Sequence, residues 1–120
     1  MNIEELREFC LSVRGANESF PFDDTVLVFK IMGKMFAYIG LEPANGRFRV
    51  QLKCDPGRTV ELRDKYEGVG AGHYSGSLLW NAVCLDGDVP DELIRELIAH
   101  SVDEVVKNLT KAKREEYLKM

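Results

Sequence analysis

The spacing of apolar residues predicts the first helix near the N-terminus. Five residues recur at three- and four-residue intervals and therefore share one helix face: Ile3, Leu6, Phe9, Cys10 and Val13. Asn2 and Glu5 have the spacing of a capping box, and Gly15 follows the pattern as an end signal. A link over residues 17–25 contains Pro21 and ends the helical period.

The next pattern has a period of two, which is typical of strands. Residues 25–41 form two apolar runs on either side of Gly33, and this arrangement predicts a β-hairpin. Residues 47–53 alternate strictly and predict a third strand. Phe48, Val50 and Leu52 then point inward, whereas the outward positions are Arg47, Arg49, Gln51 and Lys53.

Helical spacing returns twice in the second half of the chain. Asp55 and Pro56 predict the start of a helix that reaches residue 66. A further strand is predicted over residues 78–85. Pro90 opens the longest helix, which the charged residues 110–120 are expected to extend. We expect one face of this helix to pack on the sheet, in contacts of Ile94, Leu97, Ile98, Val102 and Val105 with Phe48, Val50, Leu52 and Trp80.

This order of elements predicts the fold class. A helix, three strands, a helix, a strand and a helix indicate an α+β fold with two layers, in which helices pack on one face of a mostly antiparallel sheet. The sequence contains no repeat and no linker, so residues 1–120 are interpreted as a single domain.

The net charge and its distribution limit the classes of function that the protein can have. The net charge of −4 argues against a strongly electrostatic nucleic-acid binder. However, residues 25–66 contain eight Lys and Arg against four Asp and Glu, a balance of +4 between two acidic ends.

The three cysteines are widely spaced and form no Cys-x-x-Cys pair, which indicates free thiols at Cys10, Cys54 and Cys84. With His73 and His100 also isolated, we predict no metal and no cofactor.

The N-terminal residues contain acids instead of a signal-peptide pattern, and no apolar run approaches the roughly 18–20 residues of a membrane span. We therefore expect a cytoplasmic protein without a membrane partner.

The glycine-rich stretch 67–83 does not match a known catalytic motif. It lacks the strand and helix context of a dinucleotide fingerprint, the Gly-Lys-Ser/Thr of a P-loop and the Gly-x-Ser-x-Gly of a nucleophile elbow. We expect its glycines to take positive φ and to approach the sheet closely. The stretch is interpreted as a turn with a recognition role, for which the candidate residues are Gly72, His73, Tyr74, Trp80 and Asn81. No catalytic residue is predicted, and His100 and Cys54 are interpreted as packing residues.

Five cations in the basic segment form the main candidate site. If the strands pair as a meander, they gather on one face of the sheet, with Tyr38 beside them: Lys30, Lys34, Arg47, Arg49 and Lys53. Aromatic rings next to cations suit base stacking and phosphate contact.

Several segments resemble the MmcQ/YjbR-like family of small bacterial proteins. The similar segments are VFKIMGKMFAYI, LKCDPGRTVELRDKY, WNAVCLDGDVPDELIRELIAHS and VVKNL, in that order. The resemblance implies a CyaY-like fold and a DNA-binding role. One departure matters: Ser77 and Leu78 replace a Lys-Lys pair that the family typically has before its Trp-Asn. The resemblance therefore supplies no phosphate-binding lysines in this loop.

Two hypotheses of function follow. The first is a non-enzymatic DNA-binding domain that contacts phosphates through the basic sheet face. The second is a protein-interaction or regulatory adaptor with the same fold, which binds an acidic protein partner. An enzyme is the third choice, because paired carboxylates, metal ligands and an activated nucleophile are not evident in the sequence.

Overall fold

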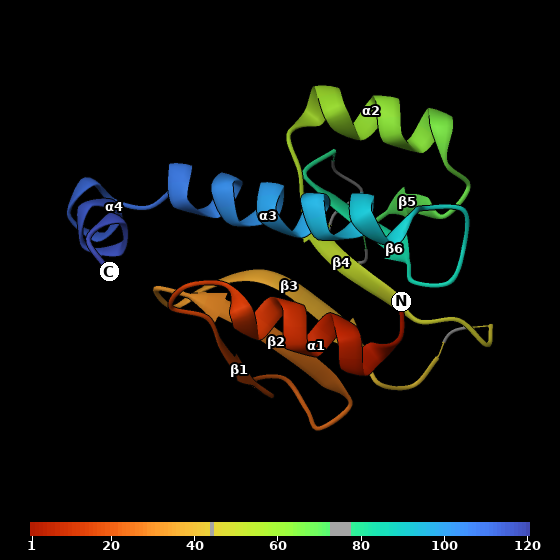
Figure 1. The fold of residues 1–120 in the computed structure, drawn as a ribbon, viewed down its shortest axis with the longest axis horizontal. Coiled ribbons are helices and arrows are strands. Elements are labelled where there is room, and N and C mark those ends of the chain that lie inside the picture. Colours follow the sequence, from red (N-terminus) through yellow and green to blue (C-terminus); the bar gives the residue numbers. More distant parts are fainter. Residues whose placement is uncertain (44, 73–77) are drawn as a thin grey trace.

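The computed structural model describes residues 1–43, 45–72 and 78–120. The elements in chain order are α1 (Ile3–Ser12), β1 (Asn17–Ser19), β2 (Val26–Ile31), β3 (Lys34–Gly40), β4 (Arg49–Lys53), α2 (Pro56–Lys65), β5 (Val69–Ala71), β6 (Trp80–Cys84), α3 (Asp91–Lys107) and α4 (Lys111–Leu118) (Figure 1).

The strands form one six-stranded sheet in the order β1-β2-β3-β4-β6-β5. Every neighbouring pair is antiparallel. The hairpin between β2 and β3 turns at Met32 and Gly33, whose φ angles are +49° and +77°. Positive φ at both central residues is the geometry of a tight type I′ hairpin turn, which Gly33 favours.

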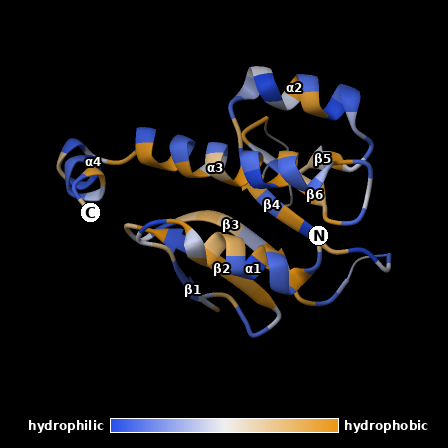
Figure 2. Ribbon diagram, viewed as in Figure 1, coloured by the Kyte–Doolittle hydropathy of each residue, from blue (hydrophilic) through white to orange (hydrophobic). Residues whose placement is uncertain are grey.

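The helices pack on one face of this sheet. Leu6 and Cys10 of α1 and Ile94 and Leu97 of α3 share a buried core with the strand residues of that face, which include Val50. In Figure 1, α1 and α3 cross in front of the strands, and Figure 2 shows apolar residues along both helices and a mostly hydrophilic α4. The predicted two-layer α+β fold is confirmed.

Hydrogen bonds fix the helices in place. Asn2 and Glu5 form the predicted capping box, and Asp55 caps α2 by accepting a hydrogen bond from the Arg58 N–H. In the middle of α3, Ser101 Oγ donates to the carbonyl oxygen of Phe36 on β3 at 2.5 Å and accepts from the Lys53 N–H on β4 at 2.9 Å. This side chain connects α3 directly to two central strands.

Three details of the sequence prediction were wrong. The short strands β1 and β5 lie at the two edges of the sheet and were not predicted. Residues 110–120 do not extend α3, because the helix ends at Asn108 and Thr110 caps a separate helix by accepting from the Lys113 N–H. Trp80 does not face α3, since it pairs with Lys53, whose neighbour Leu52 already occupies the core side.

The predicted free thiols are confirmed, and Cys10, Cys54 and Cys84 are all buried. Burial raises the pKa of the Cys10 thiol to about 12, so this thiol stays protonated near neutral pH. Among the described helices, none combines the length and apolar character needed to cross a membrane.

Candidate functional site

The sheet face opposite the helices, here called the outward face, contains the basic strand positions. Arg49, Gln51 and Lys53 alternate with Val50 and Leu52, which lie in the core. The strand register adds neighbours from β2, β3 and β6, so the outward face includes Val26, Val28, Lys30, Met35, Tyr38, Arg49, Gln51, Lys53, Trp80, Ala82 and Cys84. The predicted alternation of β4 is therefore confirmed.

A hollow of about 500 Å³ lies on this face around two arginines. Its lining residues are Phe22, Asp23, Val26, Tyr38, Gly40, Glu42, Arg47, Arg49, Gln51 and Ala71. Two aromatic rings, two guanidinium groups and the Gln51 amide thus surround one space, with carboxylates of Asp23 and Glu42 beside them. This combination suits a ligand with a flat ring and an anionic group.

The Arg47 guanidinium lies next to the Cys84 thiol, which in turn contacts the Asp86 carboxylate. The Arg47 guanidinium donates to Cys84 Sγ at 3.8 Å, and the Cys84 thiol donates to Asp86 Oδ1 at 3.1 Å. The hydrogen bond from Cys84 and the nearby Arg47 charge hold the pKa of Asp86 below its usual value. Asp86 therefore offsets part of the positive charge at this end of the outward face.

The predicted lysines do not all join the arginines. Lys30 pairs with Met35 on the outward face, and its strand β2 is two strand spacings, roughly 10 Å, from Lys53 on β4. Lys34 pairs with Ile31, a core residue, so Lys34 points to the helix side at the end of the hairpin. The strand register shifts at a bulge between Phe29 and Lys30. The pairing of Ile31 with Lys34 already includes this shift, so the orientation of Lys34 stands.

The glycine-rich stretch has a structural function in its described part. Trp80 lies on the outward face with its ring centroid 5.6 Å from that of Tyr38. Asn81 is 2% exposed, and its amide donates to Thr59 Oγ1 at 3.0 Å and accepts from Arg63 Nε at 2.9 Å. Its side chain therefore binds α2 and is not available to a ligand.

Of the remaining candidate residues of this stretch, the structure describes Gly72. Gly72 is buried against β6 and approaches it closely, as predicted. Gly68, Gly70 and Gly72 do not take positive φ, so that part of the expectation was wrong for them. His73 and Tyr74 lie outside the described residues.

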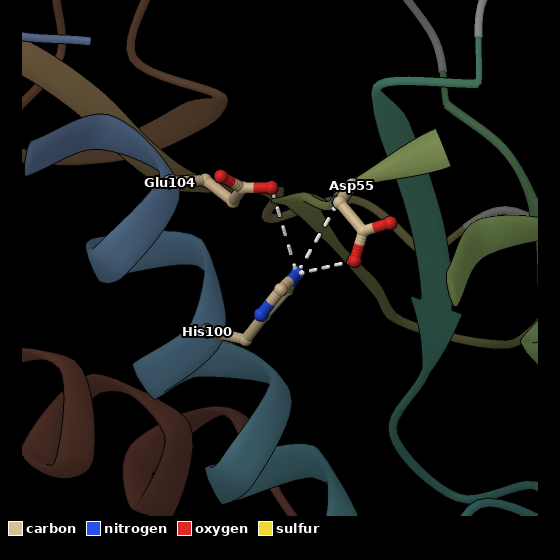
Figure 3. A group of neighbouring side chains, drawn as sticks. All are labelled: Asp55, His100 and Glu104. Carbon is tan, nitrogen blue, oxygen red and sulfur yellow. Dashed lines mark hydrogen bonds and ion pairs between the residues drawn. The ribbon is translucent and has the colours of Figure 1, made fainter. Parts of the chain in front are cut away.

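A polar cluster on the helix side of the sheet was not predicted from the sequence. His100 Nε2 accepts a hydrogen bond from the Asp55 N–H at 3.2 Å and lies 3.6 Å from Asp55 Oδ2 and 3.9 Å from Glu104 Oε1 (Figure 3). Of the described residues, these three are the group whose donor atoms lie close enough together to hold a metal ion. The His-x-x-x-Glu spacing on α3 was the available signal, because residues four apart share a helix face.

Comparison with known proteins identifies the family. The family model described as YjbR matches residues 11–103. The chain belongs to the YjbR family. It is 30% identical over 114 residues to the uncharacterized protein YjbR of Escherichia coli K12, covering 95% of each chain. It is 28% identical over 108 residues to the uncharacterized protein YbdF of Escherichia coli O157:H7, covering 90% of this chain and 87% of YbdF.

Solved structures of other bacterial proteins have the same fold. The crystal structure of Deinococcus radiodurans protein DR2400, with a DUF419 domain, superposes with a TM-score of 0.85 at 37% identity, over 97% of this chain and 87% of DR2400. A Pseudomonas syringae protein known by its crystal structure gives a TM-score of 0.72 at 20% identity, over 84% of this chain and 96% of that one. Family and fold are thus clear, and function has to be argued from the site.

Proposed function

We propose that this YjbR-family protein binds single-stranded DNA on the outward face of its sheet. The observation that supports this most is the hollow, in which Arg47 and Arg49 stand beside the exposed ring of Phe22, with the buried Tyr38 also in its lining. Phosphate oxygens accept hydrogen bonds from guanidinium groups, and exposed bases stack on aromatic rings.

A single strand fits this surface better than a duplex. A hollow of about 500 Å³ can admit an unstacked base with its phosphate, whereas the bases of a duplex remain stacked inside the helix. Duplex binding also depends on many cations that contact phosphates, and this chain has a net charge of −4. Among the residues that the structure describes, the strands of the outward face offer Lys30, Arg49 and Lys53, with Arg47 at its edge.

The test compares two forms of the same DNA sequence. A fluorescently labelled single strand of about 15 nucleotides is titrated with protein at low salt, and the matching duplex is then added as competitor. The proposal expects the single strand to bind and the duplex to compete weakly. Equal competition by duplex and single strand would indicate that only phosphates are contacted and would contradict base binding in the hollow.

A second function, an adaptor for an acidic protein partner, is favoured by two exposed aromatic rings, one of which, Phe22, lines the hollow with the arginines. Phe20 and Phe22 are 49% and 55% exposed, and aromatic residues with arginine are typical of interface hot spots. An acidic peptide that carries aromatic residues tests this alternative in the same assay. Tight peptide binding that the Phe22→Ser variant abolishes, together with no DNA binding, would favour the adaptor.

A further inference from the structure

We propose that Asp55, His100 and Glu104 bind a divalent transition-metal ion, with zinc as the expected occupant. The three residues come from the start of α2 and from α3, on the helix side of the sheet, so this site is separate from the outward face. The proposal goes beyond DNA binding and does not depend on it.

The donor atoms match zinc in kind and number. One imidazole nitrogen and two carboxylates belong to the normal zinc ligands, and three protein ligands leave a fourth position for water. Magnesium and calcium prefer sets made of oxygen alone, and Cu(I) prefers sulfur. The described cluster has neither composition.

The spacing of the donors also fits. Zinc bonds of about 2.0–2.2 Å in a tetrahedral arrangement place neighbouring ligand atoms about 3.3–3.6 Å apart. His100 Nε2 is already 3.6 Å from Asp55 Oδ2 and 3.9 Å from Glu104 Oε1, and all three donors lie within 4.8 Å of one another. Closing the set from within 4.8 Å therefore requires the donor atoms to draw together by about 1.5 Å at most, through rotation of the Glu104 side chain.

Asp55 and His100 are held in position before an ion arrives. Asp55 uses Oδ1 to cap α2 at the Arg58 N–H, which leaves Oδ2 directed to His100. The Asp55 N–H donates to His100 Nε2, so the imidazole proton sits on Nδ1 and Nε2 has the lone pair that a metal needs. An ion at Nε2 replaces this one hydrogen bond. Ser101, next to His100, fixes α3 against β3 and β4.

The buried negative charge of Glu104 favours the binding of a cation. The Glu104 side chain is only 11% exposed, whereas its ion-pair partner Lys107, 3.5 Å away, is 74% exposed. A buried carboxylate is costly unless a nearby cation compensates it, and a divalent ion provides that charge within the cluster. Asp55 and His100 side chains are 43% and 20% exposed, so an ion can enter from solvent.

Calorimetric titration of the full-length protein with zinc chloride tests the proposal. We expect one ion per chain, and at least about tenfold weaker binding in the Asp55→Asn, His100→Gln and Glu104→Gln variants. Asp55→Asn is the safest of these for folding, because asparagine is an equally good helix N-cap. The matched control is Asp103→Asn, an exposed position on the same helix, which should bind zinc like the wild type.

Cobalt(II) as a second probe distinguishes these ligands from the thiols. A visible absorption band typical of four-coordinate nitrogen and oxygen ligation supports the site. A strong near-ultraviolet thiolate band would assign the ion to a cysteine, of which Cys54 is the nearest in sequence, and would overturn the proposal. Zinc affinity that all three ligand variants retain, or no zinc binding by the wild type, would overturn it equally.

Discussion

Gly72 lies directly against the backbone of Trp80. The Gly72 N–H donates to the Trp80 carbonyl oxygen at 2.9 Å, and a Cβ added at Gly72 would lie 2.7 Å from both the Cβ and the carbonyl oxygen of Trp80. Real Cβ atoms do not approach backbone so closely, so only glycine fits here. This close approach explains why one glycine of the stretch stands before β6.

The Gly72→Ala variant should be less stable than the wild type by about 1–3 kcal/mol, because the added methyl group overlaps the backbone of β6. Chemical denaturation measures this loss. Gly70→Ala is the matched control two residues earlier, since a Cβ at Gly70 meets no atom within 4 Å. Equal stability of the two variants would contradict the close contact of Gly72 with Trp80.

The Asn81→Ala variant should lose about 1–3 kcal/mol of stability, because it leaves the buried Thr59 hydroxyl and the Arg63 guanidinium without the amide between them. A double-mutant cycle with Thr59→Ala checks the contact and should show non-additive losses. Strictly additive losses would mean that Asn81 and Thr59 act independently.

The Leu97→Ala variant should lose about 2–5 kcal/mol, since this side chain is 3% exposed in the core between α3 and the sheet. Leu118→Ala on α4 serves as the control, because Leu118 is 59% exposed and should change stability by less than about 0.5 kcal/mol. Denaturation curves of both variants give the comparison. A loss at Leu97 as small as that at Leu118 would be inconsistent with the assigned face of α3.

Asp88 should make stability depend on pH in the acid range. Its carboxylate accepts hydrogen bonds from the N–H groups of Gly68 and Glu67, both at 2.8 Å. The Gly68 bond, followed by the Glu67 bond, lowers the pKa of Asp88 below its usual value. A lowered folded-state pKa stabilises the fold above the unfolded pKa of about 3.9, and this stabilisation is lost as the pH falls through the folded value.

The Asp88→Asn variant should therefore be less stable than the wild type at pH 7, with a difference that shrinks below about pH 4. Urea denaturation at several pH values measures the difference between the two proteins. A difference that stays constant from neutral to acid pH would exclude the charged carboxylate as its source.

The sequence predicted the elements whose pattern is strong. The alternation from Phe48 to Lys53 gave the correct inward and outward sides, and the hairpin turn at Gly33 was located correctly. The edge strands β1 and β5 have three residues each, which is too short for a period of two to be recognised. Thr110 was a recognisable N-cap, but the charged residues after it suggested a continued helix.

The candidate site was harder to predict, because it depends on contacts between distant residues. Asp55 and His100 are 45 positions apart, and only the packing of α3 across the sheet places them together. Lys34 was grouped with the basic face, although its register with Ile31 turns it to the other side. Trp80 looked like a core residue because of its size, yet its pairing with Lys53 places it outward.

Binding of single-stranded DNA, as we propose it, requires Arg47 and Arg49 to contact its phosphates. The Arg47→Gln/Arg49→Gln double variant removes both charges, and Lys111→Gln/Lys113→Gln on α4 is the control with the same change in net charge. Circular dichroism of both variants confirms that they fold. Their affinities for the labelled single strand are then compared over a range of salt concentrations.

The deciding measurement is the slope of log affinity against log salt concentration for these three proteins. Each phosphate contact on single strands contributes about 0.7 to the slope, so the arginine variant should bind more weakly with a slope flatter by roughly 1.4. The lysine variant should match the wild type. An arginine variant with the wild-type slope would contradict phosphate contact by Arg47 and Arg49. A wild-type protein that binds no single strand at about 50 mM salt, where phosphate contacts are strong, would contradict DNA binding itself.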